Sequence, residues 1–507
     1  MPSVRDLIFI SLLFSLTCGS LAQLLFRDGG TGWHLRTGQI ILAAHTVPRT
    51  DPFSISTVGK PWYAWEWLSD GAMGAAFNFA GLYGISLLTS LLVSGTFTLL
   101  YTMLRRRGTG LFVSLVLVLL TTGAATIHMF ARPHVASWLL ALAWLAILES
   151  ARQRNPRRLL WLLPLMLLWV NLHAGFLLGF VLLGCYWLEA IYAPQEANPF
   201  PPAWARWLGS IGLGSVAATF ANPYGYNLHT HIYEYLGSRF LMDHIQEFQS
   251  PNFHGIPERC FAALVLLALL GLMLARTKLA LRDALLLLFA VYTGLYASRN
   301  LPVSSILIAF VIGPIWSQAL TDASLNNLIS RSPHGPLARL AAWQTRMQET
   351  DSRLRGGAWI LLALVIVFWM TVHGGALGHA LHMRAAFESA RFPVQAVDFL
   401  KSNDEREPVF STDQWGGYLI YRLYPEKVMV DDRHDLYGVD FFKSYLKILH
   451  TEPGWTNTLD SLHATRVLIP AQSSLAGALE ALPEWKVEYR DSTAVLFRKI
   501  GGNAGSQ

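Results

Sequence analysis

The chain has 507 residues, of which 53% are apolar and only 14% are charged. Soluble domains carry about 25% charged residues, so this composition excludes a large water-soluble enzyme. So many apolar side chains also exclude an intrinsically disordered chain, and the composition therefore indicates a polytopic membrane protein.

Apolar runs that meet or approach the length of a membrane-spanning helix, about 20 residues, recur from the N-terminus to residue 374. The eleven runs are 7–26, 84–104, 111–130, 135–150, 159–173, 175–192, 207–221, 260–275, 283–297, 301–317 and 357–374. We expect the first run to be an uncleaved helix, because no small-x-small cleavage site precedes a soluble domain and further runs follow. The sequence thus predicts a helical membrane protein with about eleven transmembrane helices.

Lysine and arginine gather in every second connection between these runs, in the segments 105–107, 152–158, 276–282 and 331–355. Because such loops tend to stay cytoplasmic, we predict a cytoplasmic N-terminus and a long cytoplasmic connection at 318–356. An odd number of spans then places the tail outside. Most of the net charge of +6 is explained by this topology, so we predict no nucleic-acid partner.

The tail, residues 376–507, differs in pattern from the first 375 residues. Short apolar segments, which we expect to be strands, alternate with amphipathic stretches such as 394–402 and 439–449; the expected strands are 409–410, 428–430, 467–469 and 495–497. This alternation predicts a compact α/β domain outside the membrane. The acidic segments 413–418 and 431–435 are expected at strand ends, where they would shape access of an acceptor or serve as helix caps.

The first external loop, residues 27–83, contains the acidic residue that follows the first apolar run directly, Asp28. An unpaired carboxylate is costly to hold beside lipid, so such a group is usually functional or paired. Asp28 is therefore our first candidate for a catalytic group. The alternative is a structural ion pair with Arg27 or Arg36.

Two further acidic residues of this loop, Asp51 and Glu66, stand in Pro-rich and Trp-rich surroundings. If 62–80 is helical, Glu66 and Asp70 share one face. Both Asp51 and Glu66 can serve in a site, and both can equally be turn or cap residues.

Later external turns carry the cationic residues Arg132, His134 and Arg299. Arginine offers bidentate donors to phosphate, so these residues suit a phosphate site; lipid-headgroup contact by Arg132 is the alternative. No H-E-x-x-H motif is present, and the spacing of His229 and His231 suits a strand. We predict no metal and no other cofactor.

On these residues the chain resembles the GT-C class of integral-membrane glycosyltransferases. The resemblance is carried by Asp28 and by the segments 32–38, 48–54, 65–68, 171–176, 222–225, 415–418 and 430–433. It implies a polyprenyl-phosphate-linked sugar donor and a catalytic aspartate in the first external loop. Many relatives have Asp-x-Asp where this chain has Asp28-Gly29-Gly30, so the loop lacks the second carboxylate.

We therefore expect an inverting glycosyltransferase of the bacterial inner membrane that moves a sugar from polyprenyl phosphate to an extracytoplasmic glycan, lipid or protein. Asp28 is the expected general base, with Asp51 second. The expected substrate-binding residues are His34, Arg36, Glu66, Arg132, His134, His173, Arg239 and Arg299.

A lipid-carrier flippase and a non-catalytic envelope assembly factor are the rival interpretations. The apolar runs contain few charges and polar groups crowd one side, which favours one-sided chemistry over alternating access. If the enzyme interpretation holds, Asp28, Asp51, Arg132 and Arg299 should converge on one pocket.

Overall fold

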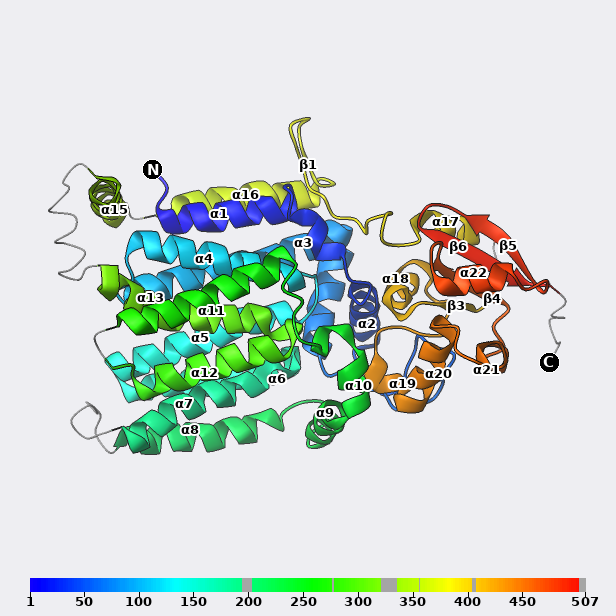
Figure 1. Ribbon diagram of the computed structural model, residues 1–507, viewed down its shortest axis with the longest axis horizontal. Coiled ribbons are helices and arrows are strands. Elements are labelled where there is room, and N and C mark those ends of the chain that lie inside the picture. Colours follow the sequence, from blue (N-terminus) through cyan, green and yellow to red (C-terminus); the bar gives the residue numbers. More distant parts are fainter. Residues whose placement is uncertain (194–202, 276–277, 321–334, 355, 404–406, 501–507) are drawn as a thin grey trace.

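The computed structural model describes residues 1–193, 203–275, 278–320, 335–354, 356–403 and 407–500. A large helical bundle is joined to a smaller domain that contains a β-sheet (Figure 1). This architecture confirms the expected fold class, a helical membrane protein with an α/β tail.

Each of the eleven expected apolar runs overlaps an α-helix. These helices are α1 (Val4–Thr17), α3 (Trp67–Arg106), α4 (Leu111–Ala125), α5 (His134–Gln153), α6 (Leu162–Leu172), α7 (Leu177–Tyr192), α8 (Ala203–Thr219), α11 (Ile256–Leu274), α12 (Leu281–Tyr296), α13 (Leu301–Leu320) and α16 (Ala358–Val372). Among the described residues, six helical segments are long and apolar enough to cross a membrane: Trp67–Arg106, Leu111–His128, His134–Gln153, Ala174–Tyr192, Ile256–Leu274 and Ser298–Leu320. The full number of spans stays a prediction.

Of the connection 318–356, residues 321–334 and 355 lie outside the described residues, and the described part contains α15 (Pro336–Arg353). The N-terminus and α15 lie at the end of the bundle that is opposite the tail domain (Figure 1). At this end the buried carboxylate of Asp6 accepts hydrogen bonds from the backbone of Ser3 and Gly357, which ties α1 to the start of α16.

The first external loop is more helical than its sequence indicates, because α2 (Thr31–Ala44) occupies its first part. Helix α3 begins at Trp67, so Glu66 is its N-cap residue. A kink at Ala80 and Gly81, where the glycine has φ +59°, separates the part of α3 that packs on α2 from the remainder. Close packing of α2 on α3 needs Gly38, since a Cβ there would overlap the backbone of Asp70.

The tail forms a four-stranded sheet in the order β3-β4-β6-β5. Strand β3 (Val409–Ser411) runs parallel to β4 (Arg466–Pro470); β6 (Ala494–Lys499) is antiparallel to β4 and to β5 (Trp485–Arg490). The described tail helices are α17 (Val394–Ser402), α18 (Asp413–Leu423), α19 (His434–Tyr437), α20 (Val439–Leu449), α21 (Trp455–Ser461) and α22 (Ser474–Glu480). A short hairpin of β1 (Ala376–Leu377) and β2 (Leu381–His382) precedes them.

Two local expectations are wrong. Residues 428–430 form no strand: only Val428 makes a bridge, to Ser54 of the first loop, so this apolar segment is buried between the domains. His229 and His231 lie on helix α9 (Asn227–Gly237), whose apolar face buries Leu228 and Ile232. Helix α10 (Arg239–His244) and the 3-10 turn η6 (Gln246–Phe248) follow α9.

Candidate active site

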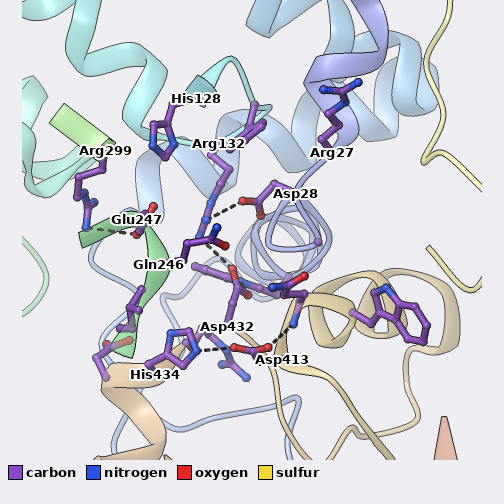
Figure 2. A pocket seen from close by; sticks show the side chains of 18 of the residues that line it. Arg27, Asp28, His128, Arg132, Gln246, Glu247, Arg299, Asp413, Asp432 and His434 are labelled. Atoms are coloured by element: carbon purple, nitrogen blue, oxygen red, sulfur yellow. Dashed lines mark hydrogen bonds and ion pairs between the residues drawn. The ribbon is translucent and has the colours of Figure 1, made fainter. Parts of the chain in front are cut away.

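A cavity of about 1010 Å³ lies where the bundle, the first external loop and the tail meet. Figure 2 shows its polar walls: Asp28 from the first loop, Arg132 and His128 from the turn before α5, Glu247 from η6, Arg299 from the turn before α13, and Asp413, Asp432 and His434 from the tail. No single segment builds this cavity.

A second cavity of about 510 Å³ adjoins the first. Both are lined by Trp65, Glu66, Arg132, Glu247 and Arg299. The remaining wall of the second cavity is largely apolar; it includes Leu177, Val181, Leu236, Phe289 and Val303, together with the imidazoles of His134 and His173. The cavity that carries most of the charged side chains therefore meets a second cavity at a cationic junction, Arg132 with Arg299.

Arg132 lies between two carboxylates at this junction. Its Nη1 is 3.1 Å from Oδ2 of Asp28, and its Nη2 is 3.2 Å from Oδ2 of Asp432. Burial lowers the pKa of Arg132, but Asp28 and Asp432 outweigh burial and raise it above its usual value. Arg132 is thus a permanent cation at the centre of the site, and Figure 2 shows it reaching toward both acids.

Asp432 comes from the tail, yet it lies against the first loop. The Nε1–H of Trp33 donates to Asp432 Oδ1 at 2.8 Å, while Asp28 accepts the backbone N–H of Gly30 at 2.8 Å. Burial raises the pKa of Asp432 to about 7, Arg132 opposes this shift, and Asp28 adds to it. A carboxyl with a pKa in this range can give or take a proton near neutral pH.

Arg299 pairs with Glu247, at 3.4 Å between Nη1 and Oε1, and its guanidinium lies 4.5 Å from the ring centre of Phe248. Burial alone would raise the pKa of Glu247, but Arg299 and Arg132 lower it to about 2. Glu247 is therefore an anion that orients Arg299, whereas Arg132 is oriented by Asp28 and Asp432. Neither arginine needs lipid headgroups to hold its position.

Glu66 is held between two imidazoles. Its carboxylate lies 3.6 Å from Nε2 of His34 and 3.4 Å from Nε2 of His173. His34 Nδ1 in turn lies 2.6 Å from Oδ1 of Asp70, which confirms that Glu66 and Asp70 face the same side. Burial raises the pKa of Glu66 to about 8.

The tail contributes a second hydrogen-bonded set. His434 Nε2 lies 2.8 Å from Oδ2 of Asp413, and the hydroxyl of Tyr445 donates to Asp413 Oδ1 at 2.8 Å. Burial lowers the pKa of His434, but its hydrogen bond to Asp413 outweighs burial and raises the pKa. This set lies close to Asp432 in the cavity lining (Figure 2).

The structure brings together most of the residues that the sequence selected, but not all of them. Asp28, Glu66, Arg132 and Arg299 line the first cavity; His134 and His173 line the second; and His34 lies directly behind Glu66. Their catalytic or binding roles stay predictions.

Asp51, Arg36 and Arg239 are absent from the described linings of both cavities. Asp51 is buried against Arg433, 2.8 Å from its Nη1, and accepts backbone N–H bonds from Phe53 and Ser54. The structure therefore does not bring Asp51 to the pocket, because its Oδ1 joins the loop to Arg433 of the tail and its Oδ2 is bound within the loop by Ser54 and Thr57.

Arg36 donates to the carbonyl of Tyr421 in α18, and the side chain of Arg239 is 94% exposed beside Asp243. A basic residue in an external loop has the same sequence signature whether it faces a pocket, a packed helix or solvent. We therefore leave both out of the site.

The site residues that sequence reasoning did not select are Asp432, Glu247, Asp413 and His434. The acidic segments 413–418 and 431–435 did predict ligand-binding loops in the tail. Their approach to Asp28 depends on how the tail docks, which no local pattern reveals.

No family model matches the chain, and no curated protein matches it in sequence. Solved structures do match in fold. The crystal structure of ArnT from Cupriavidus metallidurans, bound to undecaprenyl phosphate, is similar over 99% of this chain and 98% of that chain, with a TM-score of 0.52 and 14% identity.

The archaeal oligosaccharyltransferase AglB from Archaeoglobus fulgidus, in complex with an inhibitory peptide and a dolichol-phosphate, is similar over 92% of this chain and 69% of that chain. Its TM-score is 0.58 at 10% identity. The apo form of the same archaeal enzyme gives a TM-score of 0.52. These likenesses show that the chain has the GT-C fold, which confirms the resemblance.

Proposed function

We propose that the protein is a membrane glycosyltransferase that transfers a sugar from a polyprenyl-phosphate carrier to an extracytoplasmic acceptor, with inversion at the anomeric carbon. The observation that carries this proposal is the cationic junction, Arg132 with Arg299, which lines both of two adjoining cavities. The ligands of the ArnT and AglB structures, both polyprenyl phosphates, support it by analogy of fold.

The two cavities suit the two halves of such a donor. The phosphate would bind Arg132 and Arg299, since guanidinium groups supply paired donors to phosphate oxygens. The polyprenyl chain would follow the apolar wall of the second cavity, and His134 and His173 would line its entrance. The sugar would then lie in the first cavity, close to Asp28.

In the reaction, an acceptor hydroxyl oxygen attacks the anomeric carbon and forms the new glycosidic bond. The bond from that carbon to the phosphate oxygen breaks, and its electron pair stays with the polyprenyl phosphate. Asp28 accepts the hydroxyl proton, a role that typically contributes 10²–10⁴-fold to the rate. Arg132 and Arg299 stabilise the charge that develops on the leaving phosphate.

The same proposal includes a location in the bacterial inner membrane and an extracytoplasmic tail, residues 376–507. The basic connections and the N-terminus lie at the end of the bundle that is opposite the tail (Figure 1), and this arrangement supports a cytoplasmic N-terminus. The tail would close the acceptor side of the cavity through α18 and α19.

The test is sugar transfer in proteoliposomes that contain the full chain. The donor is undecaprenyl phosphate carrying radiolabelled glucose, mannose or arabinose, and the acceptor is a bacterial envelope extract. We expect transfer by the wild type with one of these donors, a loss of at least a hundredfold in Asp28→Asn, and no loss in Asp440→Asn, whose side chain is exposed on α20. Absence of transfer from every donor, or full activity of Asp28→Asn, would overturn the proposal.

A further inference from the structure

Asp28 is one of two carboxylates at Arg132. Oδ2 of Asp28 and Oδ2 of Asp432 lie 3.1 and 3.2 Å from the two terminal nitrogens of the same guanidinium. The two acids are more than 400 positions apart in the chain. One comes from the first loop of the bundle and the other from the tail, so this contact exists only when the tail is docked.

The first loop leaves a gap that the tail carboxylate fills. An ideal Cβ placed on Gly30 would lie 2.6 Å from Oδ2 of Asp432, 2.9 Å from Oδ1 of Asp28 and 3.0 Å from Cζ of Arg132. Any side chain at residue 30 would therefore displace the Asp432 carboxylate. The glycine at this position makes room for an acid that arrives from another domain.

The position of Asp432 is set by the buried residues beside it. Arg433, which is 3% exposed, donates to Asp431 from Nη2 at 2.6 Å and to Asp51 from Nη1 at 2.8 Å. Together with the Trp33 hydrogen bond, this network fixes the backbone of the segment 431–433 against the first loop. The Asp432 carboxyl group is therefore held in a fixed position at the cavity wall.

The contact between α18 of the tail and the start of α2 depends on glycines. A Cβ on Gly32 would overlap the carbonyl of Gly417, one on Gly417 would overlap the carbonyl of Gly29, and one on Gly416 would overlap the carbonyl of Val430. Helix α18 therefore packs backbone to backbone against the start of α2. This contact sets the separation of Asp28 and Asp432.

The charges at Arg132 do not balance when both acids are ionised, because two carboxylates share one guanidinium. Removing one negative charge by protonation relieves this excess, and the pKa of Asp432, about 7, agrees with it: burial, Asp28 and Asp431 raise this pKa, while Arg132 and His434 lower it. Asp28 is one of the groups that raise the pKa of Asp432, so the two carboxylates act on each other through their shared contact with Arg132.

We propose that the general base is a carboxylate pair, Asp28 with Asp432, and that the tail thereby supplies a catalytic residue. This inference rests on the proposed function. The acceptor hydroxyl proton passes to the pair as the new bond forms at the anomeric carbon, and the electron pair of the broken bond leaves with the phosphate. After product release the pair returns the proton to water.

The test is a double-mutant cycle on the full chain, with the radiolabelled donor that the wild type uses. Asp28→Asn and Asp432→Asn should each lower kcat by about 10²–10⁴-fold. The double variant should be no slower than the slower single variant, because the two residues act as one unit. A double variant whose loss in kcat equals the product of the two single losses would overturn the inference. An Asp432→Asn variant with wild-type kcat would overturn it as well.

The pH profile gives a readout that a structural role would not move. Wild-type kcat should fall as pH decreases through about 7, and this limb should be absent in the residual activity of Asp432→Asn. Asp432→Glu should recover part of the rate. Binding of farnesyl phosphate, a short polyprenyl phosphate, should persist in every variant and show that the site is folded.

A spectroscopic measurement distinguishes failure of this inference from failure of the proposed function. Infrared difference titration should show a carboxyl group with a midpoint near 7 that moves lower in Asp28→Asn, since Asp28 raises the pKa of Asp432. An unmoved midpoint would overturn the pair even if the wild type transfers sugar. A moved midpoint in a protein that transfers no sugar would overturn the proposed function and reduce the pair to a structural contact.

Discussion

Nε2 of His173 lies 3.4 Å from Oε1 of Glu66, and the contacts of the other ring nitrogen, Nδ1, determine which nitrogen carries the proton. His173 Nδ1 accepts the backbone N–H of Gly175 at 2.9 Å and lies 2.9 Å from the Ser137 hydroxyl. That hydroxyl oxygen already accepts the Nε1–H of Trp169, so its own proton is available to Nδ1. Nε2 of His173 therefore carries a hydrogen that points at Glu66.

On its other side Glu66 faces His34, whose Nδ1 is bound to Asp70. With the His34 proton on Nδ1, Nε2 offers a lone pair to Glu66. A proton on the Glu66 carboxyl would therefore face the lone pair of His34 Nε2, while the other Glu66 oxygen faces the Nε2 hydrogen of His173. Other charged groups that act on Glu66 are Arg132 and Arg299, which favour its ionised form, and Asp435 and Glu247, which oppose it.

The first prediction concerns stability against pH. An unfolded chain loses the Glu66 proton near the ordinary value of 4.5, whereas the folded protein keeps it up to about 8. Between these values the folded state binds more protons, so the free energy of unfolding should fall as pH rises and level off above about 8. Glu66→Gln should remove this contribution, which denaturant unfolding of both proteins at pH 5, 7 and 9 would measure. Parallel curves for the two proteins would contradict the assignment.

The second prediction concerns the cationic junction. Replacing Arg132 by alanine removes a phosphate ligand and leaves Asp28 and Asp432 facing each other without a cation. Loss of one member of a buried charged contact costs about 2–5 kcal/mol, so we expect the affinity for farnesyl phosphate to fall by more than tenfold. Arg132→Lys should recover only part of it, because an ammonium group cannot bridge two carboxylates as a guanidinium does.

Arg239→Ala is the matched control for Arg132, since it removes the same charge from the same side of the protein. Its side chain is 94% exposed, so farnesyl phosphate affinity should stay within twofold of the wild type, about 0.4 kcal/mol. Equal losses in the two variants would mean that long-range charge, and not contact at the junction, governs binding. Calorimetric titration at two salt concentrations separates these effects.

The helical bundle and the α/β tail could be predicted from composition and periodicity, because an apolar run indicates a buried or membrane-embedded segment from its local sequence alone. Asp28 and Arg132 could be selected as well, since a charged residue at the end of an apolar run has few structural explanations. Asp51 was the second candidate for the base after Asp28, yet it binds Arg433 inside the loop-to-tail interface. Asp432 could not be placed at all, because its role depends on a contact between distant segments that only the docked tail creates.

The third prediction concerns the glycine contact between α2 and α18. Gly32→Ala places a methyl group against the Gly417 carbonyl, which is backbone and cannot move aside without shifting α18. We expect a less stable tail and a loss of sugar transfer, because Asp432 would move away from Arg132. Limited proteolysis of the tail would detect the change. Gly71→Ala is the control: among the described residues no heavy atom lies within 4 Å of its added Cβ, so the tail should stay resistant.

The fourth prediction separates the anchor of the tail from its chemistry. Arg433 is buried among Trp62, Phe53 and the carboxylates of Asp51 and Asp431. Arg433→Met removes the cation from two buried carboxylates, a change that typically costs 3–5 kcal/mol in unfolding free energy. Asp432→Asn should cost much less, since its amide can still accept the Trp33 N–H. Both variants should lose sugar transfer, so unfolding measured beside activity distinguishes a displaced carboxylate from a missing one; an Arg433→Met protein of wild-type stability would contradict the anchoring role.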